Sequence, residues 1–182
     1  VRVHPHFRDT DPGGRRHGRA GPRVAGTPRT SVEDVRNFLL VLHIIGVAIW
    51  LGANGVQAFT GPRVASASDE VRAWWSDNVG AMARVLYNGA GILVLVSGVL
   101  LVIETGYEFS DAFVSIGFLA VIIGAVLGMA VFGPGSRKLT EAIHRNDAMA
   151  ERSLTSRIQA FGILDTLVLL VTIVAMVSKW GY

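Results

Sequence analysis

Five side chains that could take part in chemistry lie inside long apolar stretches of the sequence: His43, Trp50, Asn54, Asn88 and Asp165. An imidazole can bind a metal ion, and a carboxylate can hold a proton or a cation. Polar residues are rare in segments of this kind, and where they occur they usually serve either function or helix pairing. These five residues are therefore the candidate site residues.

Asp165 is the only charged residue between Ile158 and Ser178. In the middle of a membrane helix such a residue costs about 2.5–3.5 kcal/mol, so we expect it to face the interior of a helix bundle. At about 1.5 Å per residue it lies about 10 Å from one membrane surface, in a layer with Asn54 and Asn88. It could relay protons or cations. The alternative is a hydrogen bond to Asn88 or Asn54 that only joins helices.

His43 could bind haem iron or copper through its neutral imidazole. It is the only histidine within an apolar stretch, so a haem held by two histidines has no second ligand. The alternative is a hydrogen bond within the bundle, because the same arithmetic places it level with Ser97 and Thr172. Trp50 and Asn54 follow it at spacings that put all three on one helix face.

Four stretches of the chain are long and apolar enough to cross a bilayer. Only 17% of the residues are charged, whereas soluble domains usually carry about 25%. The chain contains no cysteine, which excludes disulfides and thiolate metal sites. The motifs of soluble hydrolases and nucleotide-binding enzymes are also missing. The expected spans cover about residues 37–59, 84–103, 112–132 and 158–178.

Backbone groups in lipid must bond internally, so the four spans are predicted to be helices. Short connections make neighbours antiparallel, which predicts an all-α, polytopic transmembrane four-helix up-and-down bundle over residues 32–182. Gly61-Pro62 and Gly133-Pro134-Gly135 are expected to end the first and third helices. Gly124 and Gly128 form a Gly-x-x-x-Gly pair that favours close helix packing.

Residues 1–31 form an Arg/Gly/Pro-rich tail that we expect to be disordered. The tail carries the positive charge of the chain without interleaved aromatic residues, which argues against nucleic-acid binding. The alternative is that the tail is an artefact of an upstream translation start. Ser31, followed by Glu33 and Asp34, is expected to cap the first helix.

Counting Lys and Arg near the spans predicts the orientation of the bundle. The loops 60–84 and 133–157 hold eight basic residues, so they are expected to be cytoplasmic in a multi-pass cell-membrane protein. An Arg-rich tail on the outer side conflicts with this orientation unless it is an artefact. Trp74 and Trp75 are expected at the membrane interface. The expected partner is the lipid bilayer, and a homo-oligomer or a membrane-complex partner is left open.

The segment Leu42-His43-Ile44-Ile45-Gly46, with Trp50-Leu51-Gly52, resembles the opening helix of a family of predicted bacterial four-helix integral membrane proteins of unknown function. The same pattern is similar to the copper resistance protein D family, which implies copper handling with His43 as a ligand. It also resembles the four-helix haem-dependent protoporphyrinogen oxidases, which implies haem on the first helix. The sequence lacks the intramembrane lysine of those oxidases and the Met- and His-rich outer segments of the copper proteins.

Three functions are therefore open at the level of the sequence. The first is a non-enzymatic accessory protein, or one that handles a small solute or ion. The second is a membrane haem oxidoreductase that uses His43, and the third is a component of copper transport. The sequence does not establish an enzymatic activity, and the first function is preferred.

Overall fold

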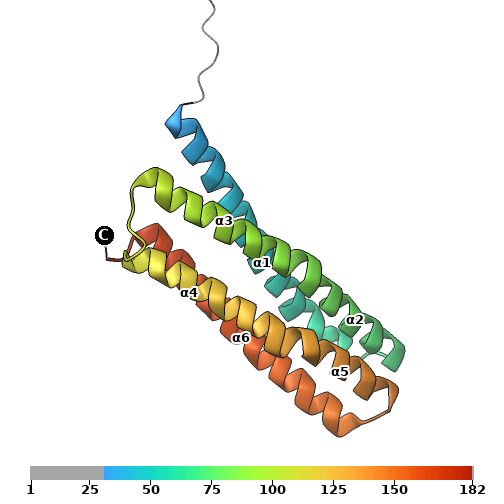
Figure 1. The fold of residues 1–182 in the computed structure, drawn as a ribbon. Coiled ribbons are helices and arrows are strands. Elements are labelled where there is room, and N and C mark those ends of the chain that lie inside the picture. Colours follow the sequence, from blue (N-terminus) through green and yellow to red (C-terminus); the bar gives the residue numbers. More distant parts are fainter. Residues whose placement is uncertain (1–30, 182) are drawn as a thin grey trace, which may run out of the picture.

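The computed structural model describes residues 31–181, and within that range it is built of helices and short connections. The predictions on the tail before Ser31 lie outside the described residues. The helical segments are α1 (Val32–Val64), α2 (Asp69–Met82), η1 (Ala83–Tyr87), α3 (Asn88–Thr105), α4 (Ala112–Leu127), η2 (Gly128–Phe132), α5 (Gly133–His144) and α6 (Ala148–Ser178). Because η1 and η2 join their neighbours without a break, the segments form four long rods (Figure 1). The predicted all-α four-helix bundle is confirmed.

The first rod, α1, begins where the sequence indicates and ends later than expected. The Ser31 hydroxyl accepts a hydrogen bond from the Asp34 N–H, and the Asp34 carboxylate accepts one from the Ser31 N–H, which completes a capping box. The expectation that Gly61-Pro62 stops this helix is wrong, because α1 continues to Val64. Gly61 has no Cβ to clash with the proline ring, and the proline lies in the last turn, so few backbone bonds are lost.

The second and third rods each contain a turn of π-helix. In η1 the Asn88 N–H bonds to the Ala83 carbonyl, and after η2 the Gly133 N–H bonds to the Gly128 carbonyl. A π turn holds one residue more than an α turn and often lies at a functional site. The two π turns lie against each other across the bundle.

The expectation that Gly133-Pro134-Gly135 ends the third helix is also wrong. The chain continues from η2 directly into α5, and Pro134 lies in the first turn of that segment. The wider π turn before it accommodates the proline ring and the missing N–H within the continuous rod. Most of the two expected loops, 60–84 and 133–157, is therefore helical. The first turns of α6, which begins at Ala148, also fall within the second of these expected loops.

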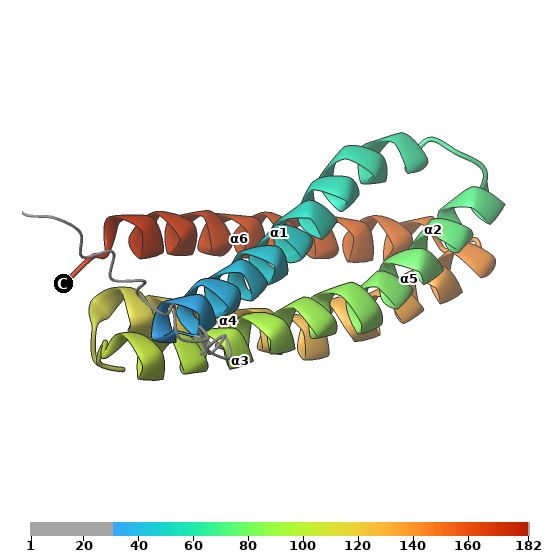
Figure 2. The same cartoon turned by 90° about the horizontal axis from the view of Figure 1, so that it is seen from above.

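The rods run side by side, with α1 along α3, α4 along α6, and α2 against α5 (Figures 1 and 2). We call the end of the bundle that holds α2, α5 and the connection 145–147 the α2–α5 end. The opposite end holds the start of α1, the connection 106–111 and the last described residues (Figure 1). The C-terminal part of α1 diverges from the other rods toward the α2–α5 end (Figure 2).

Most apolar side chains of the rods point outward. In the most apolar 18-residue window of each rod, only 17–28% of the residues are buried, and the mean hydropathy is 2.0–2.6. Val85, Met129 and Val177 are 70–80% exposed. An apolar surface of this extent is not stable in water, whereas lipid covers it without cost. The four rods are long and apolar enough to cross a bilayer, which indicates a multi-pass membrane protein.

Candidate functional site

Asp165 is buried on α6, with 3% of its surface exposed, and it is bonded to α1. The indole Nε1 of Trp50 donates to Asp165 Oδ2 at 3.0 Å, and the amide Nδ2 of Asn54 donates to the same oxygen at 2.8 Å. Trp50 and Asn54 lie one helical turn apart, so one face of α1 presents both donors. Neither of these bonds reaches the second carboxylate oxygen, Oδ1.

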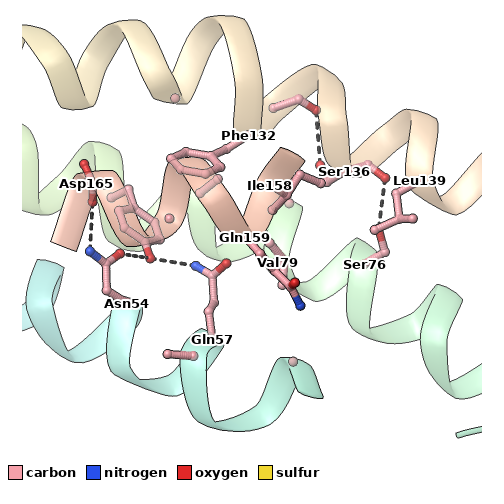
Figure 3. Close-up of a pocket in the computed structure, with 18 of the residues that line it drawn as sticks. Asn54, Gln57, Ser76, Val79, Phe132, Ser136, Leu139, Ile158, Gln159 and Asp165 are labelled. Carbon is pink, nitrogen blue, oxygen red and sulfur yellow. Dashed lines mark hydrogen bonds between the residues drawn. The ribbon is translucent and has the colours of Figure 1, made fainter. Parts of the chain in front are cut away.

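The hydrogen bonds continue from Asn54 to a third rod. The Tyr87 hydroxyl in η1 donates to Asn54 Oδ1 at 2.6 Å, and Gln57 Nε2 donates to the Tyr87 hydroxyl at 2.6 Å (Figure 3). We call Trp50, Asn54, Gln57, Tyr87 and Asp165 the polar cluster. The polar cluster joins α1, η1 and α6 within an otherwise apolar region, and a connected network of this kind fixes the orientation of its members.

Asn88 does not take part in the polar cluster. Its side chain is exposed, and the bond to Asn54 comes from its neighbour Tyr87 instead. The π turn of η1 holds one extra residue, which changes the helical phase at this point and turns Tyr87 toward α1. Sequence reasoning missed Tyr87 as a site residue. The sequence held one signal for it: Tyr87 lies next to Asn88 in an apolar stretch, and a buried phenol hydroxyl usually needs a hydrogen-bond partner.

A cavity of about 960 Å³ lies beside the polar cluster. Its volume is at the upper end of the range for small-molecule sites. Its walls are mainly apolar and contain several glycines, with polar side chains in a few places (Figure 3). The polar and charged lining residues are Asn54, Gln57, Arg72, Ser76, Arg84, Tyr87, Asn88, Ser136, Arg137, Glu151, Thr155, Gln159, Asp165 and Thr166.

The cavity occupies only the half of the bundle toward the α2–α5 end. Its lining on α3 ends at Leu95, and its lining on α6 ends at Leu167. Trp50, Ala90 and Leu169 pack together at this inner end of the cavity. A second apolar cluster, formed by Val102, Phe113, Val114 and Ala175, fills the bundle nearer the opposite end. The cavity is therefore closed toward the opposite end.

The cavity is open at its edges. Lining residues such as Ile92, Met129 and Ile163 are 63–73% exposed on the outer surface of the bundle. This is the apolar surface that lipid would cover. Apolar molecules dissolved in the membrane could therefore reach the cavity from the side.

One ion pair and two hydrogen bonds join α2 to α5 and α6 at the mouth of the cavity. Arg72 Nη2 lies 2.8 Å from Asp69 Oδ1, and Arg72 Nε lies 3.2 Å from Glu151 Oε1 of α6. The contact with Glu151 is an ion pair without hydrogen-bond geometry. The Ser76 hydroxyl donates to the Ser136 carbonyl at 2.9 Å, and the Thr140 hydroxyl donates to Asp77 at 2.9 Å. These contacts hold the helical extensions that surround the mouth.

His43 lies outside the cavity and pairs with Ser97, as its predicted depth suggests. Its Nδ1 is 3.1 Å from the Ser97 hydroxyl, which itself donates to the Leu93 carbonyl at 2.5 Å. Because the only hydroxyl proton of Ser97 is used in that bond, we assign the proton of the imidazole to Nδ1. Nε2 then carries a lone pair, as in a metal-binding imidazole.

The structure gives His43 no companions for a metal site. Among residues 31–181, no three His, Asp or Glu side chains are arranged to hold a metal ion. A haem held by His43 would also have to lie outside the 960 Å³ cavity, because His43 is not among its lining residues. The haem and copper interpretations therefore stay predictions.

Comparison with known proteins identifies no relative: no family model matches the chain, and no curated protein or solved structure is significantly similar to it. The function must therefore be argued from the polar cluster and its cavity.

Proposed function

We propose that this protein is a membrane-embedded binding protein for a small amphiphilic solute, which lies in the cavity with a hydrogen-bond donor at Asp165. One observation carries the proposal. Two donors occupy Oδ2 of a buried carboxylate on the cavity wall, and neither of them reaches Oδ1. An N–H, O–H or ammonium group of a solute complements that oxygen. The apolar walls suit the rest of such a molecule.

A cavity closed at one end favours binding over conduction. A pore needs a continuous path, and the packed residues Val102, Phe113, Val114 and Ala175 lie across the path beyond Asp165. We further propose that the α2–α5 end faces the cytoplasm, because the basic residues concentrate there. The solute then enters from the cytoplasm or from the inner leaflet.

Saturable binding of a fluorescent probe tests the proposal. The probe is the methyl ester of dansylaminoundecanoic acid, a neutral chain whose sulfonamide N–H can donate to Asp165. The protein is placed in phosphatidylcholine nanodiscs with Trp74, Trp75 and Trp180 changed to Phe, which leaves Trp50 as its only tryptophan. We expect saturable energy transfer from Trp50 to the dansyl group, above the linear background of probe dissolved in lipid.

Two glycine variants distinguish the cavity from the lipid. Gly162 lines the cavity, and a Cβ there meets open space, so Gly162→Leu places an apolar side chain on the cavity wall, in space that the solute would occupy, without a backbone clash. Gly52 also has open space around its Cβ position but does not line the cavity. We expect Gly162→Leu to abolish the saturable transfer and Gly52→Leu to retain it. Transfer that never saturates, or that survives Gly162→Leu, contradicts the proposal.

His43 supports a second candidate function, which is haem or copper binding. The observation in its favour is the lone pair assigned to Nε2 by the bond between His43 and Ser97. An absorption spectrum of the detergent-purified protein tests it. A Soret band that disappears in His43→Ala would support haem, and bound copper without a Soret band would support copper.

A further inference from the structure

The mouth of the cavity carries more positive than negative charge. Three arginines line the cavity, Arg72, Arg84 and Arg137, and Glu151 is the only acidic residue that lines it besides Asp165. Glu151 and Asp69 both lie within ion-pair distance of Arg72, so the charge of Arg72 is more than balanced by these two carboxylates. Two guanidinium groups are left.

Arg84 and Arg137 take part in none of the ion pairs between described residues. The other carboxylates nearby have their own partners. Asp77 accepts a hydrogen bond from Thr140, and Glu141 lies 3.8 Å from Arg145. Neither guanidinium is therefore within ion-pair distance of a described carboxylate, although Arg137 also lines a second, shallower hollow with Glu141.

The two arginines lie near the same contact between α2 and α5. A Cβ on Gly80 would be 3.1 Å from the Ser136 hydroxyl and 3.9 Å from Nη1 of Arg84. The Arg84 guanidinium thus lies next to Ser136, which directly precedes Arg137 in the chain. Gly80 is buried, and because it has no side chain, α2 can approach Ser136 of α5 closely beside this guanidinium.

We infer that the solute of the proposed binding site is anionic: it carries a carboxylate or phosphate that binds at Arg84 and Arg137. This inference rests on the proposed function and adds the chemical class of the ligand. A guanidinium binds either group through two parallel hydrogen bonds, and it keeps its charge in an apolar setting. The ligand is a single-chain anionic amphiphile with its charged head at the mouth, its chain along the apolar walls and a donor group at Asp165.

Free dansylaminoundecanoic acid and its methyl ester test this class directly, because they differ only in the charge of the head. Binding is measured by the energy transfer from Trp50 described above. Hydrogen bonds to charged groups contribute about 1.5–3 kcal/mol, and 1.4 kcal/mol is a factor of ten in affinity. We expect the acid to bind at least about tenfold more tightly than the ester in phosphatidylcholine nanodiscs.

Arginine variants then locate the effect. We expect Arg84→Gln and Arg137→Gln each to weaken binding of the acid by about tenfold and to weaken binding of the ester much less. Arg152→Gln is the matched control, because Arg152 is exposed on α6 and does not line the cavity. It removes one positive charge from the same end of the bundle and should change neither affinity.

Phosphatidylglycerol nanodiscs distinguish two sources of the anion. If the head of a membrane lipid also occupies the mouth, the affinity for acid already dissolved in the bilayer is lower in these nanodiscs than in phosphatidylcholine. If the ligand is a free amphiphile only, its affinity is unchanged. Both results support an anion site at Arg84 and Arg137.

Equal affinity for acid and ester overturns the inference while the proposed function stands, provided that Gly162→Leu abolishes both. Equal weakening of acid and ester by the arginine variants also overturns it, because the two residues would then support the fold and not the anion. If neither probe binds saturably, the proposed function fails together with the inference.

Discussion

Asp165 is tolerated in α6 because two donors on α1 meet the same carboxylate oxygen. A charged residue at mid-helix costs about 2.5–3.5 kcal/mol, and hydrogen bonds between membrane helices contribute about 0.6 kcal/mol on average and up to about 1.7 kcal/mol. The bonds from Trp50 and Asn54 can therefore offset about 1–3 kcal/mol of this cost. The two bonds therefore remove a large part of the cost of the carboxylate, and neither of them uses Oδ1.

Loss of the Tyr87 hydroxyl should weaken the bundle measurably. Tyr87→Phe removes the bond to Asn54 Oδ1 and leaves Gln57 without its acceptor. We expect the free energy of unfolding in detergent to fall by about 0.6–1.7 kcal/mol. Asn88→Ala is the control, because Asn88 is exposed and makes no bond to the polar cluster, and its effect should stay within about 0.5 kcal/mol. A larger loss for Asn88→Ala than for Tyr87→Phe would contradict the assignment of the polar cluster.

Much of this site was predictable from depth along the helices. Counting residues from the ends of the apolar stretches placed Asp165 in a layer with Asn54 and His43 level with Ser97, and the structure shows both pairs in contact. Counting could not choose between Asn88 and Tyr87, because that choice depends on the helical phase. A π turn changes the phase, and no residue pattern in the sequence marks it.

At the scale of the helical elements, small residues determine how closely the rods approach. Gly124 of α4 faces the Trp50 ring, and a Cβ at that position would collide with it. Gly128, the second residue of the same Gly-x-x-x-Gly pair, has open space at its Cβ position. Only half of the motif therefore serves close packing.

A pair of alanine substitutions separates these two roles. In a free helix, alanine is more stable than glycine by about 1 kcal/mol. We expect Gly128→Ala to maintain or raise the thermal stability, whereas Gly124→Ala lowers it and displaces Trp50 from Asp165. The measurements are thermal unfolding and the emission maximum of Trp50 in the single-tryptophan variant. An unchanged emission maximum in Gly124→Ala would show that the ring does not lie against α4.

The π turn of η2 should allow the third rod to lose one residue without changing its fold. Because a π turn is equivalent to an α-helix with one residue inserted, deletion of Met129 should convert η2 to α-helix and keep α5 in phase. Met129 is 73% exposed, so few contacts are lost. We expect the deletion variant to fold, with a melting temperature close to that of the unaltered protein.

A deletion in α6, which contains no π turn, is the comparison. Removal of Val171, which is also exposed, turns the following residues by about 100° and takes Ala175 out of the core. That variant should unfold at a clearly lower temperature. Equal loss of stability in both deletions would argue against the π turn.

The sequence predicted that these elements exist and are helical, but not where each helix ends. The length of each apolar stretch predicts where a helix spans the membrane, and in this sequence the four stretches are clear. Gly61-Pro62 and Gly133-Pro134-Gly135 are ordinary stop signals, and both were overridden. The first proline falls in a final turn and the second follows a π turn, and both settings depend on neighbouring residues that no local rule includes.

At the scale of the whole molecule, the cavity in one half of the bundle gives the two ends different roles. The α2–α5 end surrounds the mouth with basic residues, and the opposite end is packed by apolar side chains. The orientation in the membrane therefore decides which compartment the cavity mouth faces.

Cysteine labelling can determine this orientation, because the chain has no cysteine of its own. Ser110→Cys places a thiol at the opposite end, and Ser153→Cys places one on α6 at the α2–α5 end; both positions are exposed. With a membrane-impermeant maleimide on intact cells, we expect Ser110→Cys to react and Ser153→Cys to react only after lysis. The reverse pattern would show that the α2–α5 end faces outward.

The positions of the first and last described residues have a consequence for the design of variants. The last described residues lie against the start of α4, where the Phe113 N–H bonds to the Trp180 carbonyl, and the start of α1 lies at the same end of the bundle (Figure 1). A linker there, combined with a new start between α5 and α6, would give a circular permutant with the same neighbours for every rod. Such a permutant would have its new termini beside the cavity mouth, on the other face of the membrane.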